Sequence, residues 1–261
     1  MITAASNSRI KRLVQLNQKP KLRRTEDVFL AEGVKMFLEA PREQLQEVYV
    51  SESFLEKCSC REHLEEVGYE VVSDSVFSKI SDTCTPQGVL CVLKQFHYNI
   101  EEMLRDKAPL FLLLENIQDP GNLGTMLRTG EGAGVSGIIM SRDTVDLYNP
   151  KVIRSTMGSI YRVPFYYADD FAAAVHQVQR AGVSVYAAHL RGKNSYACQD
   201  YTKGTAFLIG NEGNGLREET AELADCYIRI PMEGKVESLN AAVASSILMY
   251  EAHRQRATIE K

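Results

Sequence analysis

The sequence predicts an α/β protein made of two units, and three observations support this fold class. Strand-like apolar runs alternate with segments of helical periodicity along the chain. The run Leu110-Phe111-Leu112-Leu113-Leu114 is too continuously apolar for a strand with one face in water, which indicates a buried parallel strand. The stretch 95–107 is polar and lacks a strand pattern, so the junction is expected there. We therefore expect a first unit over 1–97, a linker over 98–108 and a second unit over 109–261.

The first unit is expected to begin with a helix. Ser6 or Asn7 is placed to cap it, Ile10, Leu13 and Val14 share one face, and the helix ends before Pro20. An acidic amphipathic helix is expected around 62–66, between the second and third of four strands. These strands are expected at 28–31, 46–50, 69–72 and 89–93.

The second unit is expected to continue the alternation after the buried run. Its further strands are expected at 137–140, 162–166, 183–188, 206–209 and 226–230. Helices are expected from Asn122, near 151–157 and over 170–181. A last long helical pattern is opened by the segment 236–240, and its apolar residues recur at four- and three-residue spacing: Leu239, Val243, Ile247 and Tyr250.

Composition indicates a globular protein of the cytoplasm. The 261 residues are 44% hydrophobic and 25% charged, and no apolar run approaches the length of a membrane span. The N-terminus lacks the charged-then-apolar pattern expected of a signal peptide. The six cysteines form no C-x-x-C pair and join no histidine cluster, so we expect neither a metal site nor a disulfide. The net charge of −4 argues against a uniformly basic nucleic-acid-binding surface.

Positive charge is concentrated at the N-terminus. The first 24 residues hold seven basic side chains and no acidic one. Such a run is most often a solvated helix face with a flexible tail. It also has the character of an arm that contacts phosphates, and we take five of its residues as candidates for RNA binding: Arg9, Lys11, Arg12, Arg23 and Arg24.

Two glycine-containing loops follow predicted strands near the C-terminus. One runs from Gly210 to Gly215, and the other contains Pro231 and Gly234. Loops at the carboxyl ends of strands in an α/β sheet form ligand sites, and glycine lets the backbone approach a ligand. The alternative is an ordinary pair of strand–turn–helix units in which Ser238 is a helix cap and Asn211 a turn residue.

Two common nucleotide-binding motifs are excluded. The sequence contains no G-x-x-x-x-G-K-[ST]. The spacing of Gly130, Gly132 and Gly134 falls at the end of a helical stretch, whereas a dinucleotide fingerprint follows a strand and opens a helix. A dinucleotide-dependent enzyme is therefore not expected.

Three ordered motifs instead resemble the SpoU (TrmH) family of RNA ribose 2′-O-methyltransferases, members of the SPOUT class. The first runs from Asn116 through Gly124 to Arg128-Thr129, and the second from Ile209 to Leu216. The third combines Ile230-Pro231-Met232 with the segment 236–244. The resemblance covers the chain from Leu110 onward. Residues 29–33 and 85–89 resemble, more weakly, a ribosomal-protein-like (L30e-like) α/β domain that binds substrate RNA.

The resemblance implies a parallel-sheet domain with a deep trefoil knot that binds S-adenosylmethionine. Gly210, Asn211, Ile230, Met232 and Leu239 are the expected cofactor-binding residues. It also implies a homodimer with the C-terminal helix in the interface, for which Ala242, Ser246 and Met249 are small or pliable enough to allow close packing. The alternative is a helix packed only on its own sheet.

Five residues are the expected catalytic set: Asn116, Arg128, Glu212, Ser238 and Asn240. The family assigns activation of the ribose hydroxyl to the arginine, but a guanidinium stays protonated and is a poor base. We therefore favour Arg128 as a clamp for the neighbouring phosphate, with a surface salt bridge as its alternative. Glu212 is expected to orient Arg128 or Asn116, although Asn116 has the alternative of a plain turn residue. Ser238 and Asn240 are expected to hold the loop and the ribose.

The leading hypothesis is a 2′-O-methyltransferase of structured RNA, with ribosomal RNA ahead of transfer RNA. A non-catalytic RNA-binding protein that kept the fold is the rival from another class, but all five expected catalytic residues are present. An enzyme that protects ribosomes from an antibiotic shares the chemistry, and the sequence does not separate it from the leading hypothesis.

Overall fold

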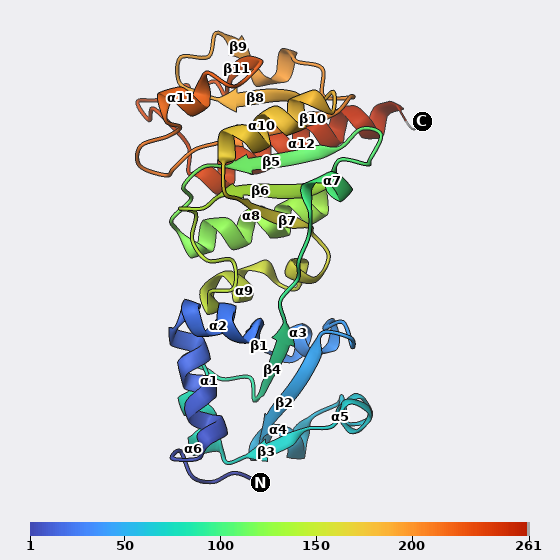
Figure 1. Ribbon diagram of the computed structural model, residues 1–261, viewed down its shortest axis with the longest axis vertical. Coiled ribbons are helices and arrows are strands. Elements are labelled where there is room, and N and C mark those ends of the chain that lie inside the picture. The colour runs from blue at the N-terminus through green and yellow to red at the C-terminus, as the bar shows by residue number, and fades with distance from the viewer. Residues whose placement is uncertain (260–261) are drawn as a thin grey trace. The chain divides into compact units, whose positions relative to one another are not determined.

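The computed structural model describes residues 1–259, and contacts divide the chain into two compact units (Figure 1). Unit 1 comprises 1–96 together with 146–161, and unit 2 comprises 97–145 and the chain from 162 onward. Glu260 and Lys261, the end of the second expected unit, lie outside the described residues.

Unit 1 contains a four-stranded mixed sheet in the order β1-β4-β2-β3. Strand β4 is antiparallel to both of its neighbours, while β3 is parallel to β2. The four predicted strands are confirmed within two residues, as β1 (Val28–Glu32), β2 (Leu45–Ser51), β3 (Glu70–Val72) and β4 (Val89–Lys94).

The helices of unit 1 are short apart from the first. Asn7 caps α1 (Ser8–Gln18), because its Oδ1 accepts a hydrogen bond of 2.9 Å from the Arg9 amide. Ile10 and Leu13 of α1 are buried, as predicted, and the acidic helix is confirmed as α5. The others are α2 (Pro20–Glu26), α3 (Val34–Leu38), α4 (Glu52–Lys57), α5 (Arg61–Val67) and α6 (Asp74–Ile80).

A segment from the middle of the chain completes unit 1. It holds α9 (Pro150–Thr156) and a 3-10 turn, η1 (Ser159–Tyr161). Tyr161 Oη donates a hydrogen bond of 3.0 Å to the Met36 carbonyl. At the start of the segment, Asp146 accepts a hydrogen bond of 2.6 Å from Arg23, whose side chain is 2% exposed. Arg23 therefore joins α2 to the segment 146–161 within unit 1.

Unit 2 contains a seven-stranded sheet in the order β7-β6-β5-β10-β8-β11-β9, and all its pairings are parallel. The predicted buried parallel strand is confirmed as β5, whose five residues are all buried between β6 and β10. The strands are β5 (Leu110–Leu114), β6 (Gly137–Ser141), β7 (Phe165–Ala168), β8 (Ser184–Ala188), β9 (Asn194–Ser195), β10 (Thr205–Ile209) and β11 (Cys226–Arg229). The expected strand at 162–166 begins later, at Phe165, after Pro164, which has no N–H to donate to a ladder.

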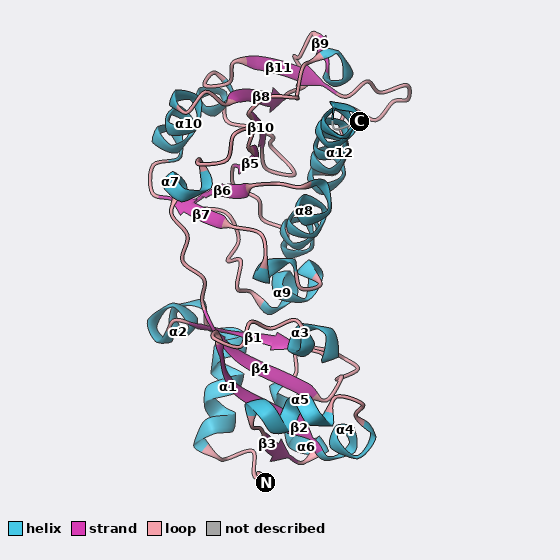
Figure 2. Ribbon diagram, turned by 90° about the vertical axis from the view of Figure 1, so that its right-hand side faces the viewer, coloured by secondary structure: helices cyan, strands magenta, loops and turns pink. Residues whose placement is uncertain are grey.

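Helices cover both faces of this sheet (Figure 2). On one face lie α7 (Ile100–Met103) and α10 (Phe171–Arg180), and on the other α8 (Pro120–Ala133) runs beside α12 (Ala241–Ile259). Two short turns, η2 (Tyr196–Cys198) and α11 (Glu218–Ala221), complete the unit. No helix in residues 1–259 has the length and apolar character needed to cross a membrane.

The last predicted helix is confirmed as α12, with a later start than expected. It begins at Ala241 and is capped by Asn240, whose Oδ1 accepts from the amides of Ala242 (2.9 Å) and Val243 (3.3 Å). Two of the apolar residues at helical spacing, Val243 and Tyr250, are 48% and 49% exposed. The buried face instead contains Ala242 and Met249, since this helix packs on α8.

Candidate active site

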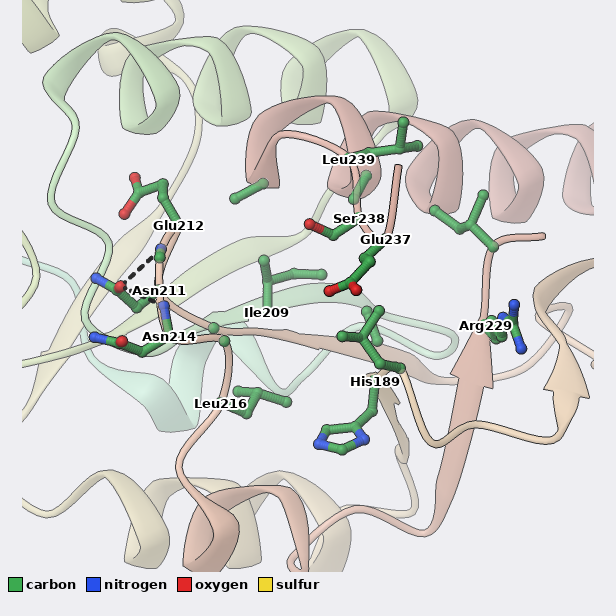
Figure 3. Close-up of a pocket in the computed structure, with 18 of the residues that line it drawn as sticks. His189, Ile209, Asn211, Glu212, Asn214, Leu216, Arg229, Glu237, Ser238 and Leu239 are labelled. Carbon is green, nitrogen blue, oxygen red and sulfur yellow. Dashed lines mark hydrogen bonds between the residues drawn. The ribbon is translucent and has the colours of Figure 1, made fainter. Parts of the chain in front are cut away.

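Loops at the carboxyl ends of β8, β10 and β11 meet the start of α12 around a pocket of about 280 Å³ (Figure 3). Because parallel strands end at the same edge of a sheet, these loops converge although they are distant in sequence. Ile209 and Ile228 at the strand ends are buried and contribute apolar lining. The pocket is therefore apolar at its base and surrounded by backbone and polar side chains.

The loop after β10 is closed by its own backbone. Asn211 and Gly215 exchange N–H···O hydrogen bonds of 3.0 and 2.9 Å, and Asn211 Oδ1 accepts from the amides of Gly213 and Asn214. A Cβ added to Gly210 would lie 2.2 Å from Gly215 C and Leu216 N. Gly210 is thus required for closure of the loop itself, a different reason from the expected approach of a ligand.

Glu212 joins this loop to the loop after β5. Its carboxylate accepts hydrogen bonds from the amides of Gln118 and Asp119, both at 3.1 Å, and from Asn122 Nδ2 at 3.0 Å. The expected partners, Arg128 and Asn116, are not among them, because Gln118, Asp119 and Asn122 lie nearer at the start of α8. Partial burial alone would raise the pKa of Glu212, but these hydrogen bonds outweigh it and hold the pKa below its ordinary value.

Asn122 connects three loops. It donates to Glu212, and its Oδ1 accepts a hydrogen bond of 3.0 Å from Asn240 Nδ2. Asp119 positions it by capping α8, since Asp119 Oδ1 accepts from the Asn122 amide at 2.7 Å. We did not single out Asn122 from the sequence, although it lies inside the first motif, six residues before Arg128.

Asn116 has the geometry of a turn residue. Its φ is 54°, its amide donates to Ser141 Oγ at 2.8 Å, and its Oδ1 accepts from Gln118 Nε2 at 2.5 Å. It does not line the pocket. Its carbonyl accepts from Asn211 Nδ2 at 2.8 Å, which is a further link between the first two motifs.

A buried carboxylate anchors the far end of the loop after β10. Glu115 is 1% exposed and accepts hydrogen bonds from the Arg217 amide (2.8 Å) and from Thr220 Oγ1 (2.5 Å). Arg217 also pairs with Asp143. Both ends of the loop are thus fixed to the loop after β5, which makes the pocket wall rigid.

The remaining catalytic candidates lie in different positions. Ser238 lines the pocket, whereas Asn240 caps α12 and reaches the pocket only through its neighbours. Arg128 is exposed on α8, does not line the pocket, and has no hydrogen bond or ion pair with any described residue. The surface salt bridge considered as its alternative is therefore not formed within the described chain.

All five expected cofactor-binding residues line the pocket: Gly210, Asn211, Ile230, Met232 and Leu239. Sequence reasoning missed His189, Arg229 and Glu237. His189 follows a correctly predicted strand, but no sequence pattern indicates that β8 lies between β10 and β11. Burial and then the charge of Arg191 lower the pKa of His189, and its ring lies 5.0 Å from that of Tyr227.

The basic N-terminal residues are folded into α1 and α2. Arg9 pairs with Glu70, and Arg12 pairs with Glu26 and Glu47. The expectation that Arg23 contacts RNA is wrong for this fold, because the side chain is buried. Lys11 and Arg24 are exposed and have no partner among residues 1–259, so they remain the candidates for phosphate contacts.

Metal ligands and disulfides are not part of the described site. The six cysteines are free, and in the described part of the chain no three His, Cys, Asp or Glu side chains are grouped as metal ligands would be.

Comparison with protein families and known proteins gives consistent matches over most of the chain. The model of the SpoU rRNA Methylase family matches residues 109–250, and that of the MRM3-like substrate binding domain matches 7–91. The 23S rRNA (guanosine(2553)-2′-O)-methyltransferase RlmP of Bacillus subtilis is 32% identical over 95% of this chain and 97% of its own.

Two solved structures resemble the chain and were determined with AdoMet. One is an rRNA methyltransferase from Sinorhizobium meliloti, with a TM-score of 0.84, 32% identity and 97% coverage of both chains. The other is the SpoU methyltransferase AviRb from Streptomyces viridochromogenes, with a TM-score of 0.87 and 26% identity over 97% of this chain and 99% of that one.

Proposed function

The chain belongs to the SpoU rRNA methylase family, and from that membership we propose that it methylates the ribose 2′-hydroxyl of a guanosine in 23S rRNA. It is an S-adenosylmethionine-dependent enzyme. The choice of guanosine rests on the relatives in Bacillus subtilis and Bordetella pertussis, whose names specify guanosine in 23S rRNA. The observation that carries the proposal is the convergence of the three family motifs at one edge of the sheet, where the second and third line a pocket and the first is hydrogen-bonded to both.

The pocket fits S-adenosylmethionine in its chemical character. Ile209, Ile228 and Ile230 offer apolar contact for a purine, and the loops around them present backbone N–H and C=O groups. Gly210, Asn211, Ile230, Met232 and Leu239 are the residues that would hold the cofactor. When bound, it supplies a methyl group on a sulfonium, and transfer breaks the S–CH₃ bond, leaves the electron pair on sulfur and forms an O–CH₃ bond as the hydroxyl loses its proton.

The residues around the pocket act mainly by positioning. A methyl transfer needs the attacking oxygen held in line with the bond that breaks, and fixed geometry supplies much of the rate acceleration. The hydrogen bonds from Asn122 to Glu212 and from Asn240 to Asn122 fix three loops relative to one another. Ser238, whose side chain lies at the pocket, is placed to contact the ribose.

Arg128 is the proposed phosphate clamp. It stays protonated at neutral pH and has no partner in residues 1–259, so its charge is available to the RNA. A guanidinium beside the phosphate next to the target ribose stabilises the negative charge that develops on the 2′-oxygen. The proton itself leaves to phosphate or water.

We extend the proposal to a homodimer, a trefoil knot and a cytoplasmic location. Val243 and Tyr250 expose an apolar face on α12, which supports a dimer through this helix. The expected interface residues Ala242 and Met249 are buried against α8 and do not form that face. The chain after β11 returns to central strand β10 and to α8, which supports threading of the C-terminal segment. Ribosomal RNA and S-adenosylmethionine are both cytoplasmic.

Mapping of 2′-O-methyl marks on total RNA from cells with and without the gene tests the proposed function. We expect loss of one guanosine mark in 23S rRNA and its restoration by the purified enzyme with S-adenosylmethionine. A lost mark confined to transfer RNA, or no lost mark, would contradict the proposal.

A further inference from the structure

Four ionisable side chains line the pocket: His189, Glu212, Arg229 and Glu237. They differ in the hydrogen bonds and ion pairs that they form within the described chain. Glu237 precedes α12 on the loop that closes the pocket. Its carboxylate points into the pocket, whereas that of Glu212 is turned away (Figure 3). Glu237 is exposed and has no hydrogen bond or ion pair within the described chain.

None of the other three ionisable side chains neutralises the negative charge of Glu237. Glu212 is held by three donors outside the pocket. His189 has a lowered pKa and is therefore neutral at neutral pH, with Nδ1 accepting a hydrogen bond of 3.1 Å from the Arg191 amide. Arg229 is exposed at the end of β11 and forms no ion pair with Glu237. The pocket thus presents one free carboxylate.

A free carboxylate attracts the methyl donor more strongly than the product, because the two ligands differ in charge at sulfur. The donor has a positive sulfonium, and S-adenosylhomocysteine, which remains after transfer, has a neutral thioether in the same place. A bound ligand displaces water around the carboxylate and strengthens its attraction to a nearby positive charge. This attraction is absent for the neutral sulfur.

We propose that Glu237 is a specificity-determining residue that selects the cationic donor over the neutral product. The proposal rests on the proposed function, and it goes beyond it by giving the pocket a means of releasing product. Loss of the sulfonium charge during transfer removes the attraction to Glu237 and favours dissociation of S-adenosylhomocysteine.

Calorimetric titration of the full chain with S-adenosylmethionine and with S-adenosylhomocysteine tests the proposal. Glu237→Gln keeps the shape of the side chain and removes its charge. We expect the variant to lose about fivefold in affinity for the donor and less than about twofold for the product, which is the upper range for an ion pair with an exposed side chain. Glu233→Gln is the matched control, because Glu233 is exposed on the same loop and does not line the pocket.

Equal losses for both ligands in Glu237→Gln would overturn the inference, because Glu237 would then contact a part that donor and product share. A second measurement needs no variant. In the wild type, the affinity for S-adenosylmethionine divided by that for S-adenosylhomocysteine is expected to fall as the salt concentration rises, since exposed charges are screened. A ratio independent of salt contradicts the inference. Wild-type protein that binds neither ligand contradicts the proposed function itself, and the inference falls with it.

Discussion

Asn122 donates a hydrogen bond of 3.0 Å from its side-chain amide to Glu212 Oε1, which joins the loop after β5 to the loop after β10. The side-chain oxygen of Asn122, Oδ1, accepts a hydrogen bond from Asn240 Nδ2 at the start of α12. One side chain thus sets the relative positions of all three family motifs. Glu212 accepts the hydrogen bond at one end of this chain, so its ionisation is coupled to the order of the site.

Asn122→Ala is expected to raise the pKa of Glu212 towards its ordinary value, because it removes a donor to the carboxylate. A lowered pKa stabilises the fold above the ordinary pKa of glutamate, and this stabilisation is lost as pH falls through the lower value. The variant should therefore lose about 1 kcal/mol of unfolding free energy at neutral pH and less in acid.

NMR titration of Glu212 and denaturant unfolding at several pH values measure these effects. Thr125→Ala is the control, since Thr125 is an exposed residue of α8 whose side chain has no hydrogen bond in the described structure. An unchanged Glu212 titration in Asn122→Ala would show that the bond is not formed in solution.

Arg128→Ala is expected to reduce methyl transfer by at least about a hundredfold, the typical effect of removing a group that stabilises developing charge. Affinity for S-adenosylmethionine should stay within about twofold, because Arg128 does not line the pocket. Single-turnover transfer to an rRNA fragment and calorimetry measure the two quantities. Loss of cofactor affinity would assign Arg128 a different role.

Gly210→Ala is expected to destabilise unit 2 by about 1–3 kcal/mol and to weaken cofactor binding, because the new Cβ overlaps the Gly215–Leu216 backbone. Gly234→Ala is the matched control, since an added Cβ there meets nothing within 4 Å. Thermal unfolding with and without S-adenosylmethionine compares the two variants. Equal behaviour would mean that the loop after β10 is looser than its hydrogen bonds indicate.

The double variant Lys11→Gln, Arg24→Gln is expected to weaken RNA binding and to reduce the slope of log K against log salt by up to about 2. These two side chains are exposed and unpaired in the described chain, while Arg9 and Arg12 already pair with carboxylates. Filter binding at several salt concentrations measures the slope, with Lys79→Gln as a control on the exposed surface of unit 1. An unchanged slope would show that the first two helices do not contact RNA.

Local patterns predicted the strands and the sheet edge at which the pocket lies. Apolar runs such as Leu110–Leu114 mark buried parallel strands, and glycine-rich turns after strands mark the edge where ligands bind. The resemblance to the SpoU family singled out Gly210 and Ile230, and both line the pocket. The position of His189 was not predicted, because the placement of β8 between β10 and β11 depends on long-range pairing.

Side-chain burial was the least predictable property. Arg23 has the sequence context of a surface arginine, yet it is buried because Asp146, more than a hundred residues away, supplies its partner. Helix α12 packs on α8 and buries Ala242 and Met249, whereas Tyr250 of the same helix is half exposed. Neither pattern of burial follows from periodicity within one segment.

Calorimetric titration of S-adenosylmethionine into wild-type protein, Arg128→Ala and Ala244→Phe tests the central claim most directly. Ala244 lines the pocket in the first turn of α12, so a phenyl ring there fills the space. We predict one site per chain in the wild type, retained in Arg128→Ala and abolished in Ala244→Phe. Well-folded wild-type protein that takes up no S-adenosylmethionine, or uptake unaffected by filling the pocket, would contradict the account.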